Sequence, residues 1–361
     1  GLGMAGKTGT GKIVYGTVEA LKIGLGSGGD TFTVESTHAG ATELNTNGGG
    51  DTVTLETISG NTTVNTAAGS DTVNIRTIDA ATTVNTGADT DTVNVGSLAP
   101  ATGGDVNGIG AVLTINGDGE ADSLNVDDTA DTAGNTGNLT ATSITGLGMT
   151  GSIVYGTVEA LKIGLGSGGD TFTVESTHAG ATELNTNGGG DTVTLETISG
   201  NTTVNTAAGS DTVNIRTIDA ATTVNTGADT DTVNVGSLAP ATGGDVNGIA
   251  ALLTINGEGE ADSLNVDDTG DTAGNTGNLT ATSITGLGMT GKIVYGTVES
   301  LTIGLGSGDD TFTVESTHAG TTELNTNAGN DTVALETISG NTTVNTAAGS
   351  DTVNVRTIAA A

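Results

Sequence analysis

The sequence predicts an all-β chain that folds as a parallel β-solenoid, with two short strands in each coil of about 20 residues. Three observations lead to this fold class. The chain is built from a long repeat, each long repeat contains a shorter one with alternating apolar and polar residues, and the composition suits strands and tight turns. Thr, Val and Ile favour strands, whereas Gly, Asn and Asp favour turns. Right-handed winding is expected for parallel crossovers.

The long repeat has a period of 140 residues, since the segment that begins at Ile13 returns at Ile153 and, slightly altered, at Ile293. We therefore expect an irregular start over 1–12, repeats over 13–152 and 153–292, and a partial third repeat over 293–361. The first full period differs from the second at five positions: Gly110 becomes Ala250, Val112 becomes Leu252, Asp118 becomes Glu258, Ala130 becomes Gly270, and Ser152 becomes Lys292. Such recent duplication multiplies a mechanical or binding unit, whereas a catalytic site gains little from it.

The short repeat is an apolar residue followed seven positions later by Asp, then Thr or Ser, then an alternating run. In the first repeat the matches are Ile23 with Asp30, Leu44 with Asp51, Val64 with Asp71, Val84 with Asp91, and Ile115 with Asp122. A sixth match, Ile144 with Gly151, replaces Asp by Gly, which gives six coils per repeat. The alternation directs apolar side chains inward and Thr and Asn outward, into polar ladders. Neither strand of a coil can bury its apolar face alone, so the coils must stack in register.

The two sides of each coil behave differently. The turn that carries Asp always has the same length, whereas the opposite side varies, from 13 residues between Asp51 and Val64 to 24 between Asp91 and Ile115. Insertions around 99–110 and 127–138 lie on the variable side, and we expect them to form surface loops that contact partners. A turn of constant length is held by a fixed geometry.

The corner aspartates are the candidate metal-binding residues. Stacking in register would place successive carboxylates about 4.8 Å apart, where two like charges repel by roughly 3–4 kcal/mol at an effective dielectric of about 20. Carboxylate and turn carbonyl oxygens suit Ca²⁺ better than Mg²⁺. In the alternative interpretation, each Asp caps its own turn by accepting backbone N–H bonds. The candidate ligands are Asp30, Asp51, Asp71, Asp91, Asp122, Asp170, Asp191, Asp211, Asp231, Asp262, Asp309, Asp310, Asp331 and Asp351.

Two corners resemble a known family. The stretches Gly26-Ser-Gly-Gly-Asp30-Thr-Phe-Thr and Asn327-Ala-Gly-Asn-Asp331-Thr-Val are similar to the Gly-Gly-x-Gly-x-Asp-x-apolar-x nonapeptide of hemolysin-type (repeats-in-toxin) proteins. The resemblance implies a parallel β-roll with bound Ca²⁺ in secreted bacterial proteins, with Asp30 and Asp331 as ligands. The family carries this turn on both sides of a shorter coil, whereas here one side carries it. The wider pattern also resembles repeats of giant bacterial surface and adhesin-like proteins.

The charge of the chain and its few histidines limit the kinds of partner and site that we expect. With 42 acidic and 8 basic side chains the net charge is −34, which disfavours binding to nucleic acid and insertion into anionic membranes. The histidines occur once per repeat, in turns, and we expect them to be solvated. The run from Asp127 to Asp131 is a weaker candidate for a second cation site.

We expect no enzyme activity. The predicted function is that of a structural segment of an extracellular or cell-surface fibre, filament or adhesin stalk of bacterial type, rigidified by Ca²⁺. Its expected partners are further copies, through head-to-tail self-association or continuation of a longer array, and lateral fibre contacts. The alternative is the calcium-binding secretion module of an exported bacterial enzyme.

Overall fold

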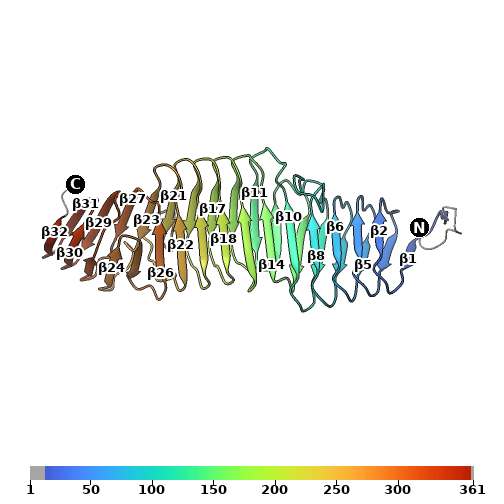
Figure 1. Cartoon of the computed structure of the whole chain (residues 1–361), viewed down its shortest axis with the longest axis horizontal. Helices are drawn as coiled ribbons and strands as arrows, with labels where there is room; N and C mark the ends of the chain where they lie inside the picture. The colour runs from blue at the N-terminus through green and yellow to red at the C-terminus, as the bar shows by residue number, and fades with distance from the viewer. Residues whose placement is uncertain (1–12, 359–361) are drawn as a thin grey trace. The chain divides into compact units, whose positions relative to one another are not determined.

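The computed structural model describes residues 13–358, and all the regular structure in that range is β-strand (Figure 1). The predicted fold class is confirmed, because the strands alternate between two mainly parallel sheets, as in a β-solenoid. The chain separates into two compact units. Within the described range, unit 1 holds 13–130 and 142–162, and unit 2 holds 131–141 and 163–358. The irregular start expected over 1–12 lies outside the described residues.

Unit 1 contributes strands to both sheets. In spatial order, the first contains β1 (Ala20–Gly24), β3 (Ala41–Asn45), β5 (Thr62–Asn65), β7 (Thr82–Asn85), β9 (Val112–Asn116), β13 (Ser152–Gly156) and β12 (Ser143–Gly146). The second contains β2 (Thr31–Val34), β4 (Thr52–Leu55), β6 (Thr72–Ile75), β8 (Thr92–Val95) and β10 (Ser123–Asp127). β12 runs antiparallel to β13, which is parallel to β9.

Unit 2 continues the same pattern. One of its sheets contains β11 (Thr136–Thr140), β15 (Thr171–Val174), β17 (Thr192–Leu195), β19 (Thr212–Ile215), β21 (Thr232–Val235), β23 (Ser263–Asp267), β27 (Ser300–Gly304), β29 (Thr321–Ala328) and β31 (Asn341–Ala348). The other contains β16 (Ala181–Asn185), β18 (Thr202–Asn205), β20 (Thr222–Asn225), β22 (Leu252–Asn256), β26 (Lys292–Gly296), β25 (Ser283–Gly286), β24 (Thr276–Thr280), β28 (Thr311–Val314), β30 (Thr332–Ile338) and β32 (Thr352–Ile358). β14 (Ala160–Gly164) crosses the division between the units.

The core is a set of apolar columns that run from coil to coil. In unit 2, Val204 pairs with Val224, and Val224 pairs with Ile255, in parallel register. These side chains are at most 1% exposed. Burial of each contributes about 1.5–3 kcal/mol. The predicted stacking in register is thus confirmed, and the core consists of branched aliphatic residues with an occasional ring such as Phe312.

A junction of three antiparallel strands interrupts the parallel stack in unit 2. β26 extends the sheet parallel to β22, β25 pairs antiparallel with β26, β24 pairs antiparallel with β25, and β28 then runs parallel to β24. Ile284 and Gly291, the second copy of the predicted sixth corner, lie in this segment. The structure therefore refines the count of six coils: the sixth corner lies in the turn between the antiparallel strands β25 and β26, where Ile284 pairs with Ile293.

The junction also moves equivalent strands to opposite sheets. β16 and β29 have equivalent sequences one repeat apart, and their numbers differ by thirteen strands, from 16 to 29. Because thirteen is odd, β16 lies in the sheet of β18 whereas β29 lies in the sheet of β27. An outward-facing residue of one repeat therefore recurs on the opposite face in the next repeat of unit 2. The sequence period alone does not reveal this alternation.

Candidate functional site: the aspartate ladder

The corner aspartates of unit 1 form a hydrogen-bonded ladder. The backbone N–H of Asp30 donates to Oδ1 of Asp51, and that of Asp51 donates to Oδ1 of Asp71, both at 2.7 Å. The same bond links Asp71 to Asp91 at 2.7 Å and Asp91 to Asp122 at 2.9 Å. The Asp122 N–H in turn donates to a carboxylate oxygen of Glu159 at 2.8 Å. We call this column, with its counterpart in unit 2, the aspartate ladder.

Unit 2 contains the ladder in two stretches. The first runs through Asp170, Asp191, Asp211, Asp231 and Asp262 with donor–acceptor distances of 2.7–2.9 Å, and ends on Glu299. The second begins at the N–H of Asn275 and runs through Asp310, Asp331 and Asp351. Asp309, also predicted as a ligand, lies outside the ladder, where its exposed carboxylate accepts bonds from Asn330.

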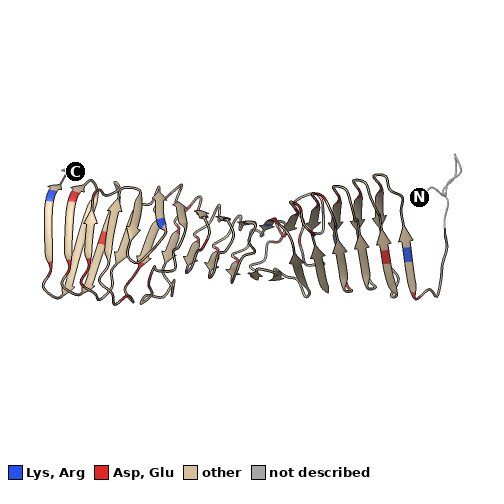
Figure 2. Ribbon diagram, turned by 90° about the horizontal axis from the view of Figure 1, so that it is seen from below, with Lys and Arg blue, Asp and Glu red and all other residues tan. Residues whose placement is uncertain are grey.

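The hydrogen bonds explain why these turns keep one length. Each aspartate supplies Oδ1 to the N–H of the aspartate one coil earlier, so the geometry of every corner is fixed by its neighbour. Each aspartate therefore caps a backbone N–H of the preceding coil. The alternative interpretation of the sequence had each aspartate cap an N–H of its own turn. Glu159 and Glu299 serve the same purpose, and only the structure reveals them, because they lie far from the Asp motif in the sequence. Acidic residues at the turns are visible in Figure 2.

The second carboxylate oxygen of the ladder residues is enclosed. Oδ2 is buried and has no hydrogen-bond partner among the described residues at these positions: Asp30, Asp51, Asp71, Asp91, Asp122, Asp170, Asp191, Asp211, Asp231, Asp262, Asp310 and Asp331. Apart from Asp30, these residues are at most 3% exposed. Burying a charged carboxylate oxygen without a hydrogen-bond donor costs free energy of folding. Burial of so many Oδ2 atoms along one column therefore disfavours the ionised form of these aspartates.

The pKa values of several ladder carboxyls are raised by this burial. Burial raises the pKa of Asp91 to about 6 and that of Asp211 to about 6, against an ordinary value of 3.8. The bond from a backbone N–H lowers each pKa in part, and the neighbouring aspartates raise it further. Desolvation and like charges both disfavour the ionised form, so they act in the same direction here.

The donor set of the ladder does not fit a calcium site. Ca²⁺ takes six to eight oxygen ligands. Each corner offers one carboxylate, whose Oδ1 is already an acceptor for a backbone N–H. Within 13–358, no group of three or more acidic or histidine side chains is arranged to hold a metal ion. The enclosed Oδ2 atoms are single oxygens spaced along a column. Binding of Ca²⁺ at the fourteen candidate residues stays a prediction that chelation can test.

The acidic loop predicted as a second cation site clamps an insertion loop. In unit 1, Asp127 accepts the N–H of Gly104 at 2.8 Å and Asp128 accepts the N–H of Val106 at 3.0 Å. In unit 2, Asp268 makes the equivalent bond to Val246, and burial raises its pKa to about 7. These carboxylates fix the loop that presents Leu98, and its equivalent Leu238, at 51% and 53% exposure.

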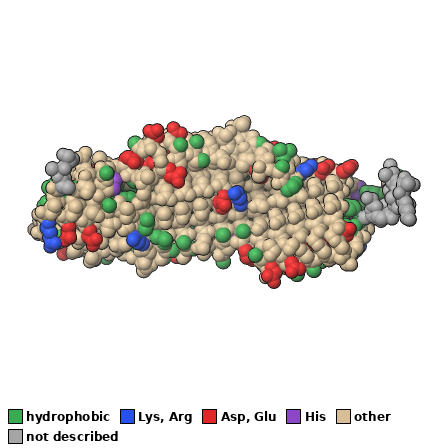
Figure 3. Space-filling model, in the orientation of Figure 1, with side chains coloured by type: hydrophobic (Ala, Val, Ile, Leu, Met, Phe, Trp, Pro, Cys, Tyr) green, Lys and Arg blue, Asp and Glu red, His purple; other side chains and the backbone are tan. Residues whose placement is uncertain are grey.

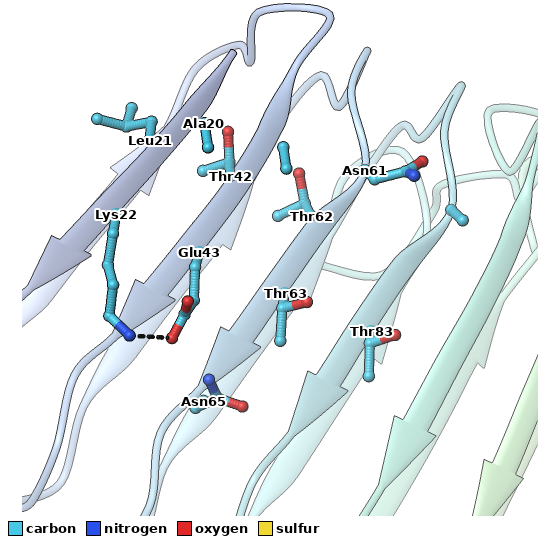
Figure 4. A pocket seen from close by; sticks show the side chains of 12 residues that line it. Ala20, Leu21, Lys22, Thr42, Glu43, Asn61, Thr62, Thr63, Asn65 and Thr83 are labelled. Carbon is cyan, nitrogen blue, oxygen red and sulfur yellow. Dashed lines mark hydrogen bonds and ion pairs between the residues drawn. The ribbon is translucent and has the colours of Figure 1, made fainter. Parts of the chain in front are cut away.

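The outer faces carry the predicted polar ladders. In unit 1 the side-chain amide of Asn65 donates to Asn45, that of Asn85 to Asn65, and that of Asn116 to Asn85, at 2.7–2.8 Å. Beside this ladder lies a shallow groove on the face formed by β1, β3, β5 and β7 (Figure 4). The groove is lined mainly by Ala and Thr, and the Lys22–Glu43 ion pair of 2.7 Å closes one side.

The histidines are less solvated than the sequence suggests. His318 is half-buried, with its ring edge against Tyr295 at 5.9 Å between ring centroids. Burial lowers its pKa, because the charged imidazolium is disfavoured away from water. The ring contact of His38 with Tyr15 is equivalent, at 5.9 Å.

No family model matches the chain, and no curated protein matches it. Within the described residues, no helix is long and apolar enough to cross a membrane. On the face shown in Figure 3, acidic groups lie in small clusters along the surface, and backbone together with uncharged polar side chains covers most of the rest.

Proposed function

We propose that the chain is a structural segment of an extracellular or cell-surface fibre, filament or adhesin stalk. The observation that carries this proposal is the continuity of its bonding from coil to coil. In unit 2, Asp211 bonds to Asp231 at one corner, while Asn225 bonds to Asn205 on the outer face and Val204 packs in register with Val224. A repeat devoted to such neighbour contacts resists extension along its stacking direction, as a stalk requires.

The surface supports an extracellular location. A net charge of −34 favours solubility at high local density. The exposed Leu238 side chain, on a loop held by carboxylate clamps, offers a rigid lateral contact point.

On β32, Val353 and Val355 are exposed at 42% and 53% beside a strand edge. A second copy of the chain that stacked on this edge would cover them, and we include head-to-tail self-association in the proposal.

The proposal is tested by locating the chain on the cells that make it. Antibodies raised against the folded protein should label intact cells, and immunogold should follow surface fibres in electron micrographs. Labelling that appears only after the cells are permeabilised would contradict the extracellular role. Sedimentation velocity over a range of protein concentrations tests self-association separately, because head-to-tail growth increases the sedimentation coefficient with concentration.

A further inference from the structure

The repeats contain asparagines in the pattern Asn-x-Thr, which is the acceptor signal for N-linked glycans on exported chains. Within 13–358 the pattern occurs at six positions: Asn61, Asn138, Asn201, Asn278, Asn330 and Asn341. The structure separates these asparagines into two groups, because some of the side-chain amides are held by a carboxylate and the others are not.

Three of the amides are engaged. Nδ2 of Asn138 donates to Oε1 of Glu175 at 2.9 Å, and Nδ2 of Asn278 donates to Oε1 of Glu315 at 3.0 Å. The amide oxygens of Asn138 and Asn278 are buried. Nδ2 of Asn330 likewise donates to a carboxylate, at 3.1 Å. A sugar on any of these three nitrogens would have to share the space around the amide with an acidic side chain.

The other three asparagines, Asn61, Asn201 and Asn341, are exposed, and their side-chain amides have no hydrogen-bond partner in the part of the chain that the structure describes. In Figure 4 the Asn61 side chain extends away from Thr62 at the start of β5. The backbone is nevertheless fixed, because the Asn61 carbonyl accepts the N–H of Thr42 at 2.9 Å, and the equivalent bond in unit 2 measures 2.8 Å. Each of these positions therefore presents an open amide on a rigid backbone.

The threonine of the signal lies on the same side of the strand as the open amide. In β5, Thr62 is buried and its hydroxyl donates to the carbonyl of Gly60 at 2.8 Å. Thr63 faces outward, onto the groove side of the sheet (Figure 4). Because side chains alternate along a strand, the Asn61 amide and the Thr63 hydroxyl share the outer face. These are the two groups that the acceptor signal requires.

We propose that Asn61, Asn201 and Asn341 are acceptors of an N-linked glycan. This inference rests on the proposed extracellular location, because the transfer takes place on exported chains. The donor is an oligosaccharide joined to a lipid through a diphosphate, and a membrane transferase of the producing cell catalyses the step. A bond forms between Nδ2 and C1 of the sugar, and the amide loses one proton. The bond from C1 to the diphosphate oxygen breaks, and the lipid diphosphate leaves with the electron pair.

The junction places the two glycans of unit 2 on opposite edges. The strands from β17 to β31 in one sheet are parallel, so they all begin at the same edge. β17 begins after the corner at Asp191 and β31 begins with Asn341, so these two residues share that edge. Asn201 directly precedes β18 in the other sheet, at the edge where β17 ends. The glycans of unit 2 therefore project from alternate edges.

Mass spectrometry of tryptic peptides from the natural protein tests the proposal. Cleavage after Lys and Arg separates the two groups, because peptides 23–76 and 163–216 contain Asn61 and Asn201, whereas 77–162 and 217–292 contain Asn138 and Asn278. We expect a glycan on the first two peptides and none on the second two. Peptides 23–76 and 163–216 without sugar, from protein that antibodies detect at the cell surface, would overturn this inference and leave the fibre proposal standing. Protein confined to the cell interior would overturn both.

Matched variants test the choice of site independently of the natural location. The variant N61Q/N201Q/N341Q removes the exposed acceptors, and the control N138Q/N278Q/N330Q removes the engaged ones. The full chain is secreted from cultured animal cells, which glycosylate asparagines on their exported proteins. The wild-type protein and the control should carry glycans, whereas N61Q/N201Q/N341Q should carry none and keep the wild-type circular dichroism spectrum. Glycan on N61Q/N201Q/N341Q, or none on the secreted wild-type protein, would overturn the proposal.

Discussion

The backbone N–H groups at the corners of the parallel coils and at the corner of the junction have different hydrogen-bond acceptors. At a parallel corner of unit 2, the N–H of Asp211 donates to the Asp231 carboxylate in the next coil at 2.8 Å. At the corresponding position of the junction, the N–H of Gly291 donates to the backbone carbonyl of Ile249 at 2.9 Å. An aspartate is needed where stacked turns leave the N–H without a carbonyl acceptor. A glycine suffices where the loop that precedes β22 brings the carbonyl of Ile249 to it.

The junction needs glycine for a second reason, which is space. A Cβ on Gly291 would lie 2.2 Å from the carbonyl oxygen of Ala251, and one on Gly277 would lie 2.5 Å from the ring of Phe312. Gly286 has a φ of +83°, in the region that favours glycine. The parallel coils use side-chain atoms to define their corners, whereas the junction excludes side chains so that backbones can approach.

Placing an aspartate at the junction corner should lower the free energy of unfolding more than the other substitutions below. Gly291→Asp introduces a ladder residue where backbone atoms leave no room and no N–H requires a carboxylate. We expect a loss of about 4 kcal/mol or more in the free energy of unfolding, measured by urea denaturation with circular dichroism. Gly296→Ala is the control, because the nearest atom to its Cβ would lie 3.8 Å away, and it should cost less than about 1 kcal/mol.

Substitutions in the apolar interior should lower the free energy of unfolding equally in the parallel coils and in the junction. Ile215 in a parallel coil and Ile284 in the junction are both 0% exposed. Replacement of either by Ala should cost about 3 kcal/mol, through lost burial and the cavity that remains. The same urea experiment measures both variants. A cost at Ile284 below about 1 kcal/mol would show that the junction is loosely packed and would weaken the comparison.

Much of this fold could be predicted from the sequence, because strict alternation such as Val213 and Ile215 around Asn214 specifies both strand type and inward face. Stacking in register followed from the near identity of successive coils. The sequence did not reveal the antiparallel pairing at Ile284 and Gly291, since the apolar spacing there matches that of the other corners. For the site, the motif located the aspartates but not the acceptors of their backbone N–H groups. The contribution of Glu299 depends on packing between distant segments.

The outer asparagine ladder should contribute less than the core. Asn225 donates to Asn205 and accepts from Asn256, both at 2.7 Å on the outside of β20. Asn225→Ala removes both bonds, and we expect a cost of about 1–2 kcal/mol because partly exposed hydrogen bonds exchange with water. Thr223→Ala, on the same outer face of β20, provides the control. Equal effects of the two substitutions on the urea midpoint would show that the amide ladder is energetically neutral.

The surface ion pair should have the smallest effect. Arg216 lies 2.6 Å from Glu196, with both side chains more than one-third exposed. Solvent screening limits such a pair to about 0.5 kcal/mol, so Glu196→Gln should lower stability only slightly, and less so at high salt. Arg216 also donates to the Ala239 carbonyl at 3.0 Å. Arg216→Lys should therefore loosen the insertion loop, detectable as faster amide exchange over 237–249.

Thermal unfolding at neutral pH, in excess EGTA and in excess Ca²⁺, tests the central claim most directly. That claim is that the parallel corners are held by hydrogen bonds from backbone N–H groups to aspartates, without a bound metal. It predicts the same melting temperature in both conditions once ionic strength is matched with Mg²⁺, for the wild-type protein and for D211N. A calcium-specific increase in the wild-type melting temperature that D211N reduces would contradict the claim and restore the ladder as a calcium site.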